Sequence, residues 1–373
     1  MSLRWRLLQS DDALRAELAA VAGSEVVAVD TEFMRRNTFF PQVALVQLCF
    51  GDQALLLDPL AIKDPAPLAE LLTDPKLIKV LHSASEDLEV FRHWLGVLPE
   101  PLFDTQRAAA LLDMGFGLGY SALVNMICKT ELPKGETRSD WLQRPLTDSQ
   151  CEYAAQDVAW LLPVWRELDR RCAEQGKTDW VLADGRDAIE ALGSAGPDYL
   201  KRISNAWKLN PRQLAALMAV CAWREDTARR KNKPRGWIID DQACLQLAQF
   251  DPRTPAELAA KVDLPPAVLR RDGDELLQLL ATQRALPESA LPDRLPGPLN
   301  PGQRQQLKKL KSQARSLAEE MAVAPEVLLQ SKDYELLLRE ASGYKVDPPC
   351  HWQGWRKEVI LAPLRESLAG TAQ

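Results

Sequence analysis

Hydrophobic runs at the front of the chain alternate with short polar breaks and predict four strands, at 24–33, 42–50, 53–58 and 77–81. Gly51-Asp52, between the second and third runs, favours a hairpin turn, so the first three strands are expected to form an antiparallel meander. Helices are predicted at about 68–72, from a cap at Ser83 or Ser85 to about Leu95, and at about 105–113, 120–129 and 148–170. This order of elements indicates a mixed α/β domain.

Strand patterns disappear beyond residue 210, where short amphipathic segments broken by proline, glycine and aspartate predict an all-helical region. Helices are predicted there at Pro211–Arg230, Asp241–Ala248, Pro255–Val262 and Pro266–Arg284. Residues 285–302 contain five prolines and are expected to form a linker. The helices after the linker echo the earlier order of a longer helix, a loop and shorter helices, which indicates a divergent duplication.

The composition is that of an ordinary soluble globular protein. The 373 residues allow two or three domains, with 46% apolar and 26% charged residues. No apolar run has the length of a membrane span, the first residues lack a signal-peptide core, and the seven cysteines are scattered without a CxxC pair, so a reducing cytoplasmic setting is expected. With only three histidines, any bound metal is expected to have mainly oxygen ligands.

The net charge of −6 conceals an asymmetry along the chain. Residues 1–200 contain 19 basic and 31 acidic residues, whereas residues 201–373 contain 27 basic and 21 acidic residues. An acidic front half joined to a basic back half suits a catalytic module that gathers carboxylates around cations, coupled to a module that holds a polyanion.

Two carboxylates, Asp30 and Glu32, end the first predicted strand. Because they alternate with Thr31, strand geometry places both side chains on the same side. Like charges held this close repel each other, and burial adds to the cost unless a cation neutralises them. The structural alternative is that Asp30 only terminates the strand while Glu32 is solvated.

Further polar residues stand at comparable positions. Asp87 follows the fourth predicted strand and lies near the start of a helix. Tyr153 and Asp157 are four residues apart, and therefore lie on one helical face. The neighbours of Asp157 are largely apolar, and a buried acid requires a partner.

These residues carry a resemblance to a known family. D-T-E-F, an aspartate about 55 residues later, and Y-x-x-x-D are similar to the three exonuclease motifs of the DEDD superfamily, in its tyrosine-bearing branch. The stretch S-D-W-x-x-R-P-L-x-x-x-Q-x-x-Y-A-A-x-D-V resembles the ribonuclease D family. Trp223-Arg224, the basic run 229–235 and Ile239-Asp240-Asp241 resemble the first of that family's two HRDC domains, and the region from about 300 resembles the second loosely.

The resemblance implies three domains. Residues 1–200 would form an α/β ribonuclease H-like exonuclease domain, with a mixed sheet of three antiparallel strands followed by parallel ones. Residues 208–288 would form an HRDC domain and residues 297–373 an HRDC-like domain, both small and all-α.

The resemblance also implies a chemistry. Asp30, Glu32, Asp87 and Asp157 would hold two Mg²⁺ or Mn²⁺ ions, roughly 3.5–4 Å apart. Tyr153 would orient the attacking water, because an unperturbed pKa of about 10 makes it a poor base at neutral pH. Glu32 would also contact the terminal ribose. The expected activity is that of a monomer that hydrolyses the 3′ tails of structured RNA, such as tRNA precursors, stepwise from 3′ to 5′ to nucleoside 5′-monophosphates.

Six residues of the front domain are candidate substrate contacts with structural alternatives. Phe33, Met34 and Gln47, the last at the end of the stretch Leu45–Gln47, are candidates to line the terminal base, whereas core packing is favoured for Leu45. His82 is either a substrate contact or a hydrogen-bonded core histidine. Two cations are candidate phosphate contacts or solvated loop residues: Lys134 and Arg138.

The basic run before Trp237 is a further candidate. It is expected to hold phosphates while the indole stacks on a base, although runs of charge commonly just face solvent. Such contacts would add affinity without reading sequence. The cations of this run are Arg229, Arg230, Lys231, Lys233 and Arg235.

Two other functions are alternatives. A DNA-directed 3′–5′ exonuclease of the same superfamily would differ in how it treats the 2′-hydroxyl. A non-catalytic RNA-binding scaffold would be expected to have lost one or more of the acids, and none is lost. A helicase is disfavoured because the sequence contains no G-x-x-x-x-G-K-[ST] loop.

Overall fold

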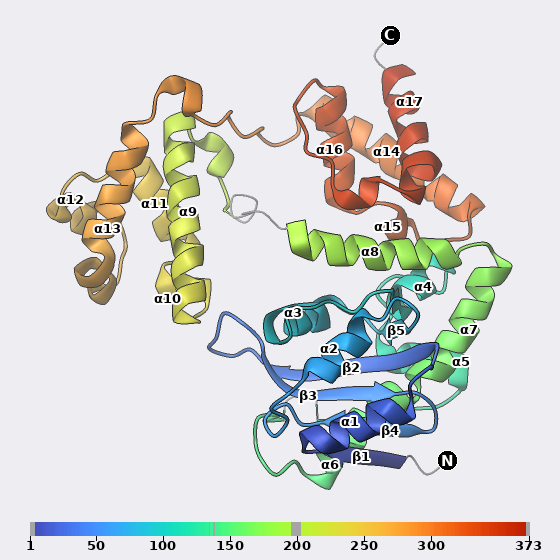
Figure 1. Cartoon of the computed structure of the whole chain (residues 1–373). Coiled ribbons are helices and arrows are strands. Elements are labelled where there is room, and N and C mark those ends of the chain that lie inside the picture. The colour runs from blue at the N-terminus through green and yellow to red at the C-terminus, as the bar shows by residue number, and fades with distance from the viewer. Residues whose placement is uncertain (1–3, 134, 137–138, 195–202, 371–373) are drawn as a thin grey trace. The chain divides into compact units, whose positions relative to one another are not determined.

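The computed structural model describes residues 4–133, 135–136, 139–194 and 203–370 (Figure 1). The chain divides into two compact units. Unit 1 comprises Met1–Met34, Pro41–Ser194 and Asn300–Gln373, and unit 2 comprises Arg35–Phe40 and Ala195–Leu299. Within the described residues, every helix is too short or too polar to cross a membrane.

Unit 1 is built on a six-stranded mixed sheet in the order β1-β4-β3-β2-β5-β6. β2, β3 and β4 form the predicted antiparallel meander, and the remaining pairings are parallel. Two short strands escaped prediction, β1 with five residues and β6 with three. The strands are β1 (Arg4–Leu8), β2 (Val26–Met34), β3 (Gln42–Cys49), β4 (Gln53–Leu57), β5 (Ile78–Leu81) and β6 (Leu102–Asp104).

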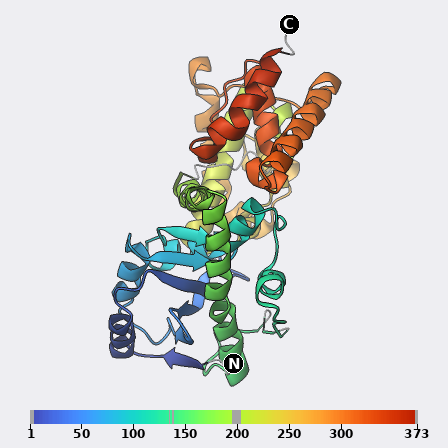
Figure 2. The same ribbon diagram turned by 90° about the vertical axis from the view of Figure 1, so that its right-hand side faces the viewer.

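Helices cover the two faces of this sheet, as the two views show (Figures 1 and 2). α1 (Asp11–Ala20), α2 (Ala66–Thr73) and α3 (Ser85–Trp94) bury one face, in a core that includes Val27, Val29, Val46 and Leu48. α6 (Asp148–Ala159) and α7 (Leu161–Glu174) contact the sheet from the other side. Because side chains alternate along a strand, Asp30, Glu32 and Gln47 face α6. The remaining helices are α4 (Thr105–Leu111), α5 (Tyr120–Cys128) and α8 (Thr178–Ser194).

Two local predictions were wrong. The helix expected over 148–170 breaks at Trp160, because Pro163 has no N–H to donate to the carbonyl of residue 159. Neither predicted serine caps α3, whose N-cap is Ala84. Instead, the backbone N–H groups of Ser83 and Ala84 donate to the Asp104 carboxylate, each at 3.0 Å.

The C-terminal helices of unit 1 are attached firmly to the sheet domain. The Lys177 ammonium donates to the carbonyls of Leu111, Met321 and Ala322 at 2.8–2.9 Å. These helices are α14 (Pro301–Glu320), α15 (Pro325–Leu328), α16 (Ser331–Ala341) and α17 (Ala362–Gly370), with a 3₁₀ turn at Cys350–Trp352 and a π turn at Lys357–Leu361. Residues 300–373 thus belong to the same compact unit as the sheet domain. The predicted HRDC-like domain at 297–373 stays a prediction.

Unit 2 contains the predicted helices almost at their predicted bounds. Its core also takes in Phe39, whose N–H donates to the Asn232 side chain at 3.0 Å. The predicted linker is irregular except for Glu288–Ala290, up to the start of α14. The helices are α9 (Pro211–Lys231), α10 (Arg235–Ile238), α11 (Asp241–Phe250), α12 (Pro255–Lys261) and α13 (Pro266–Arg284), with a 3₁₀ turn at Ala206–Lys208.

A constant offset relates the two helical sets. α9, α10 and α11 begin at residues 211, 235 and 241, and α14, α15 and α16 begin 90 residues later in each case. Both long helices start with the same capping box, Asn210 with Gln213 and Asn300 with Gln303. This regularity agrees with the predicted duplication.

Candidate active site

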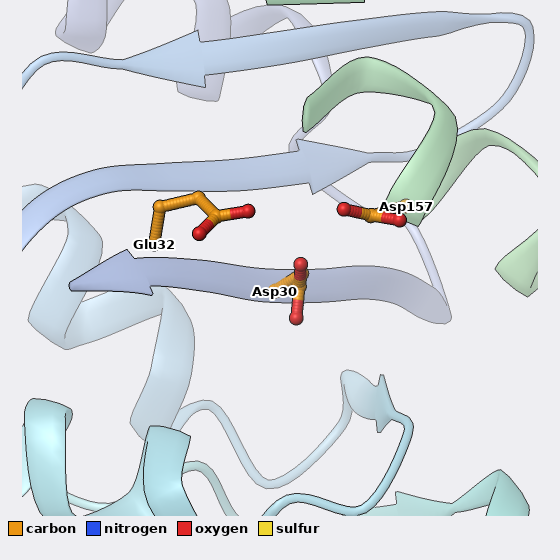
Figure 3. A group of neighbouring side chains, drawn as sticks. All are labelled: Asp30, Glu32 and Asp157. Atoms are coloured by element: carbon orange, nitrogen blue, oxygen red, sulfur yellow. The ribbon is translucent and has the colours of Figure 1, made fainter. Parts of the chain in front are cut away.

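Three predicted acids meet above the sheet. Asp30 and Glu32 project from β2 and Asp157 projects from α6, and one oxygen from each lies within 4.8 Å of the others (Figure 3). All three side chains are half-buried. The i, i+2 spacing on β2 and the packing of α6 over this face produce the cluster.

The fourth predicted acid, Asp87, lies beside this cluster but outside that 4.8 Å group. It is buried in the first turn of α3, and its Oδ1 accepts a hydrogen bond of 2.5 Å from the Thr31 hydroxyl. Thr31 points to the opposite face from its neighbours Asp30 and Glu32. Asp87 is nevertheless close enough for its charge to raise the pKa of Asp30.

The pKa values of all four acids are raised, above all by burial. Negative neighbours add to the effect at Asp30, and at Glu32, whose pKa rises to about 9. The pKa values of Asp87 and Asp157 rise to about 7, although hydrogen bonds from Thr31 and Tyr153 lower them in part. No described lysine or arginine is among the groups that shift these four values.

This charge distribution fits a divalent cation. The cluster supplies only carboxylate oxygens, the ligands that Mg²⁺ and Mn²⁺ prefer. A bound cation would also favour the charged carboxylates, and so oppose the effects of burial and repulsion on the pKa values. The donor set thus agrees with the metal dependence expected of a 3′–5′ exonuclease domain.

Tyr153 stands one helical turn before Asp157. Burial and the charge of Asp157 raise its pKa, so the hydroxyl stays protonated and able to donate at neutral pH. Its ring lies 6.0 Å from that of the buried Trp141. Tyr153 and Asp157 line a cavity of about 330 Å³ together with Ser121, Leu132, Pro133, Gly135 and Gln156.

Residues that the sequence reasoning missed hold α6 in place. Arg144 donates to both oxygens of the buried Asp58, at 2.7 and 2.8 Å, and to the carbonyl of Ala44 at 2.7 Å. The Tyr120 hydroxyl donates to the Gln156 carbonyl at 3.0 Å. Arg144 lies in the S-D-W-x-x-R-P-L stretch, so the motif contained the signal, but its partners are distant in the sequence.

The predicted base and histidine contacts fall into different environments. Phe33 and Met34 are half-buried at the end of β2. Gln47 has no exposed surface and no partner for its amide within the described chain, which favours a place in the core over its predicted contact with substrate. The register places it opposite Asp30, beneath α6. His82 bonds Thr105 at 2.9 Å and the Leu118 carbonyl at 3.0 Å, which favours its structural alternative. Lys134 and Arg138 lie outside the described residues.

The predicted basic run in unit 2 is largely occupied by internal contacts. Arg229 and Arg235 both pair with the buried Glu225, and Lys231 lies 3.7 Å from Asp272. Both arginines also stack on Phe39, at 4.8 and 4.6 Å from the ring centre. The other two cations are Arg230, 3.4 Å from the Thr227 hydroxyl, and Lys233, 5.7 Å from the ring centre of the exposed Trp237.

Comparisons with known proteins agree with this geometry. A family model described as 3′-5′ exonuclease matches residues 6–173, and an HRDC domain model matches residues 213–280. The chain is 43% identical to ribonuclease D of Pseudomonas paraeruginosa, covering 98% of this chain and 97% of that protein. It is 35% identical to ribonuclease D of Escherichia coli, covering 98% and 99%.

A solved structure extends the likeness to the whole fold. The crystal structure of Escherichia coli RNase D, described as an exoribonuclease involved in structured RNA processing, matches with a TM-score of 0.90. The match has 35% identity and covers 98% of this chain and 99% of that one. The acid cluster, the exonuclease match and these relatives lead to one conclusion: the chain belongs to the ribonuclease D family of 3′–5′ exoribonucleases.

Proposed function

We propose that this exoribonuclease trims the 3′ ends of structured RNA such as tRNA precursors, releases nucleoside 5′-monophosphates and uses two divalent ions. The observation that carries the proposal is the approach of Asp30, Glu32 and Asp157 to within 4.8 Å, next to a cavity lined by Tyr153. The relative from Escherichia coli, described as acting in structured RNA processing, supports the class of substrate.

Asp30, Glu32 and Asp157 would hold the ions together with Asp87. The Oδ1 atom of Asp87 is bonded to Thr31, so its other oxygen is the one available for this purpose. Divalent ions bound here supply Lewis acidity, which lowers the pKa of water and neutralises charge on the leaving 3′-oxygen.

Tyr153 would position the attacking water by a hydrogen bond. Its raised pKa makes the hydroxyl a weaker acid, so at neutral pH it keeps its proton and acts by geometry. Glu32 would also contact the terminal ribose, and Phe33 and Met34 would line the terminal base. Lys134 and Arg138 remain candidate phosphate contacts.

We also infer a cytoplasmic monomer with a second HRDC-like domain at 297–373, after the first at 208–288. The seven cysteines are all free, as in a reducing compartment. The constant offset of 90 residues between the two helical sets supports the second domain.

The test uses 5′-labelled RNA that carries a hairpin and a single-stranded 3′ tail. With Mg²⁺ or Mn²⁺, the unsubstituted protein should produce a ladder that shortens from the 3′ end and stalls at the hairpin. EDTA or Asp157→Ala should stop the shortening. Equal shortening of DNA of the same length would contradict the preference for RNA. RNA binding without any shortening would instead support a non-catalytic RNA-binding scaffold.

A further inference from the structure

A row of cations runs along one exposed face of α14. Arg304, Lys308, Lys311 and Arg315 follow one another at intervals of four, three and four residues, which places them on one face of a helix. The first 18 residues of α14 contain no aspartate or glutamate. The basic stripe, as these four residues are called below, therefore has no acid beside it on its own helix until Glu319.

The basic stripe differs from the 229–235 run in how its charge is used. Among the described residues, none of its four cations forms an ion pair, whereas Arg229, Lys231 and Arg235 are each paired. Lys311 is fixed in direction by the Ser331 hydroxyl, 3.2 Å away, and lies 5.9 Å from the ring centre of Tyr334. These contacts orient its ammonium without neutralising it.

Helix stability does not explain this arrangement. Like charges four residues apart repel each other, and a cation close to the N-terminus of a helix, such as Arg304, opposes the helix dipole. Apolar contacts hold α14 in place instead, through the buried Leu310, Ala314 and Ala318. Cations placed against the preference of the helix indicate a polyanionic partner.

The helix that carries the basic stripe is fixed to the sheet domain of unit 1. At the end of α14, the Lys177 ammonium binds the Met321 and Ala322 carbonyls, and the Ala324 N–H donates to the Ala110 carbonyl at 2.8 Å. The four cations extend over about 16 Å of helix, so they form a row of positive charge that a linear polyanion can follow.

We propose that the basic stripe of α14 binds the phosphate backbone of the RNA substrate, independently of base sequence. The inference rests on the proposed function for the identity of the polyanion. It assigns the main contact of the helical tail with the RNA backbone to α14, whereas the sequence pointed to the 229–235 run.

The test neutralises the basic stripe in R304Q/K308Q/K311Q/R315Q. A matched control, K63Q/K76Q/K345Q/K357Q, removes the same charge from scattered exposed lysines of unit 1. Binding of the tailed hairpin RNA is measured in EDTA between 50 and 200 mM salt. The stripe variant should bind about 10- to 100-fold more weakly at low salt, and its log–log salt slope should fall by about 3. The salt slope of the control variant should fall by less than 1.

Kinetics with metal separate this idea from the proposed function. For the stripe variant, KM for the tailed hairpin should rise more than kcat falls, and the loss should be larger than on a trinucleotide, which offers few phosphates. Equal RNA binding by the stripe variant and the control would overturn the proposal. It would favour an acidic protein surface as the partner of the basic stripe. Unsubstituted protein that binds RNA but does not shorten it would contradict the proposed function alone. The single variant K308Q, with a smaller drop in slope, checks that the effect does not come from misfolding.

Discussion

Unit 1 contains two acidic sites that resolve their charge in opposite ways. In the cluster proposed to be catalytic, called the catalytic cluster below, Asp30, Glu32 and Asp157 face one another. Burial raises the pKa values of all three, and negative neighbours raise those of Asp30 and Glu32 further. Asp184 is buried, and its carboxylate accepts hydrogen bonds of 2.6–3.0 Å from Arg356 and Arg107. Burial would raise the pKa of Asp184, but the two arginines outweigh it and the pKa is lowered.

The difference teaches how to tell a binding site from a structural one. Burial alone raises a carboxyl pKa in both places, so the sign of the net shift reports whether the fold supplies the cation. At Asp184 the fold supplies two cations, and the pairing with Arg356 links α8 to the C-terminal helices. At the catalytic cluster the fold supplies none within the described residues, which leaves the negative charge for a ligand.

The largest expected effect comes from removing an acid from the catalytic cluster. Asp30→Ala should reduce RNA hydrolysis at least about 1,000-fold, because it removes an ion ligand that stabilises transition-state charge. The folded state and much of the RNA binding should remain. Residual activity above a tenth of the unsubstituted rate in a single-turnover assay would contradict this role.

Breaking the structural acid should affect stability instead. Asp184→Ala leaves Arg356 buried without its main partner, and should lower the free energy of unfolding by about 3–5 kcal/mol. Urea denaturation measures this change. Asp187→Ala is the control, because Asp187 is partly exposed and comes no closer to Arg356 than 3.5 Å, whereas Asp184 lies 2.6 Å away. Similar losses for the two variants would show that Asp184 is not the centre of this link.

Tyr153→Phe tests the hydroxyl beside the catalytic acids. Loss of one positioned donor should slow the chemical step about 100-fold. The midpoint of Mn²⁺ titration, followed by thermal stabilisation, should change little because the carboxylates remain. An unchanged single-turnover rate would refute the positioning role.

The smallest expected effect is a difference in pH dependence. The catalytic acids have raised pKa values when folded, with Glu32 at about 9 and Asp157 at about 7, so their contribution to stability is present at low pH and lost as the pH rises. In EDTA, the unsubstituted protein should therefore lose about 1–3 kcal/mol relative to Glu32→Gln between about pH 5 and pH 9. Thermal unfolding at several pH values measures the difference.

The pH dependence of stability should also change when divalent ions are added, and it should have the opposite sign at Asp184. Added Mn²⁺ should stabilise the unsubstituted protein more at pH 8 than at pH 5, because ions bind the deprotonated acids. Asp184 has a lowered pKa, so its contribution is present above the ordinary aspartate range and lost on acidification. A metal-free stability profile that rises from pH 5 to pH 9 would contradict the assignment for the cluster.

Local pattern in the sequence determined much of this protein. The alternation of Val27, Val29 and Thr31 with Asp30 and Glu32 specified a strand with two acids on one side, and Tyr153 with Asp157 specified one helical face. Caps and proline positions placed the helices of unit 2 nearly at their observed bounds. Such signals are readable because they depend on neighbours within a few residues.

Only the tertiary structure decided which residues meet across the chain. Asp184 and Arg356 are 172 positions apart, and nothing in either local sequence shows that they pair. The same holds for Gln47, which sheet register buries opposite Asp30, and for Lys177, whose carbonyl partners attach residues 300–373 to unit 1. Burial and ion pairing depend on packing between distant segments, and this packing decided which acids neutralise their charge internally and which are left for a metal ion.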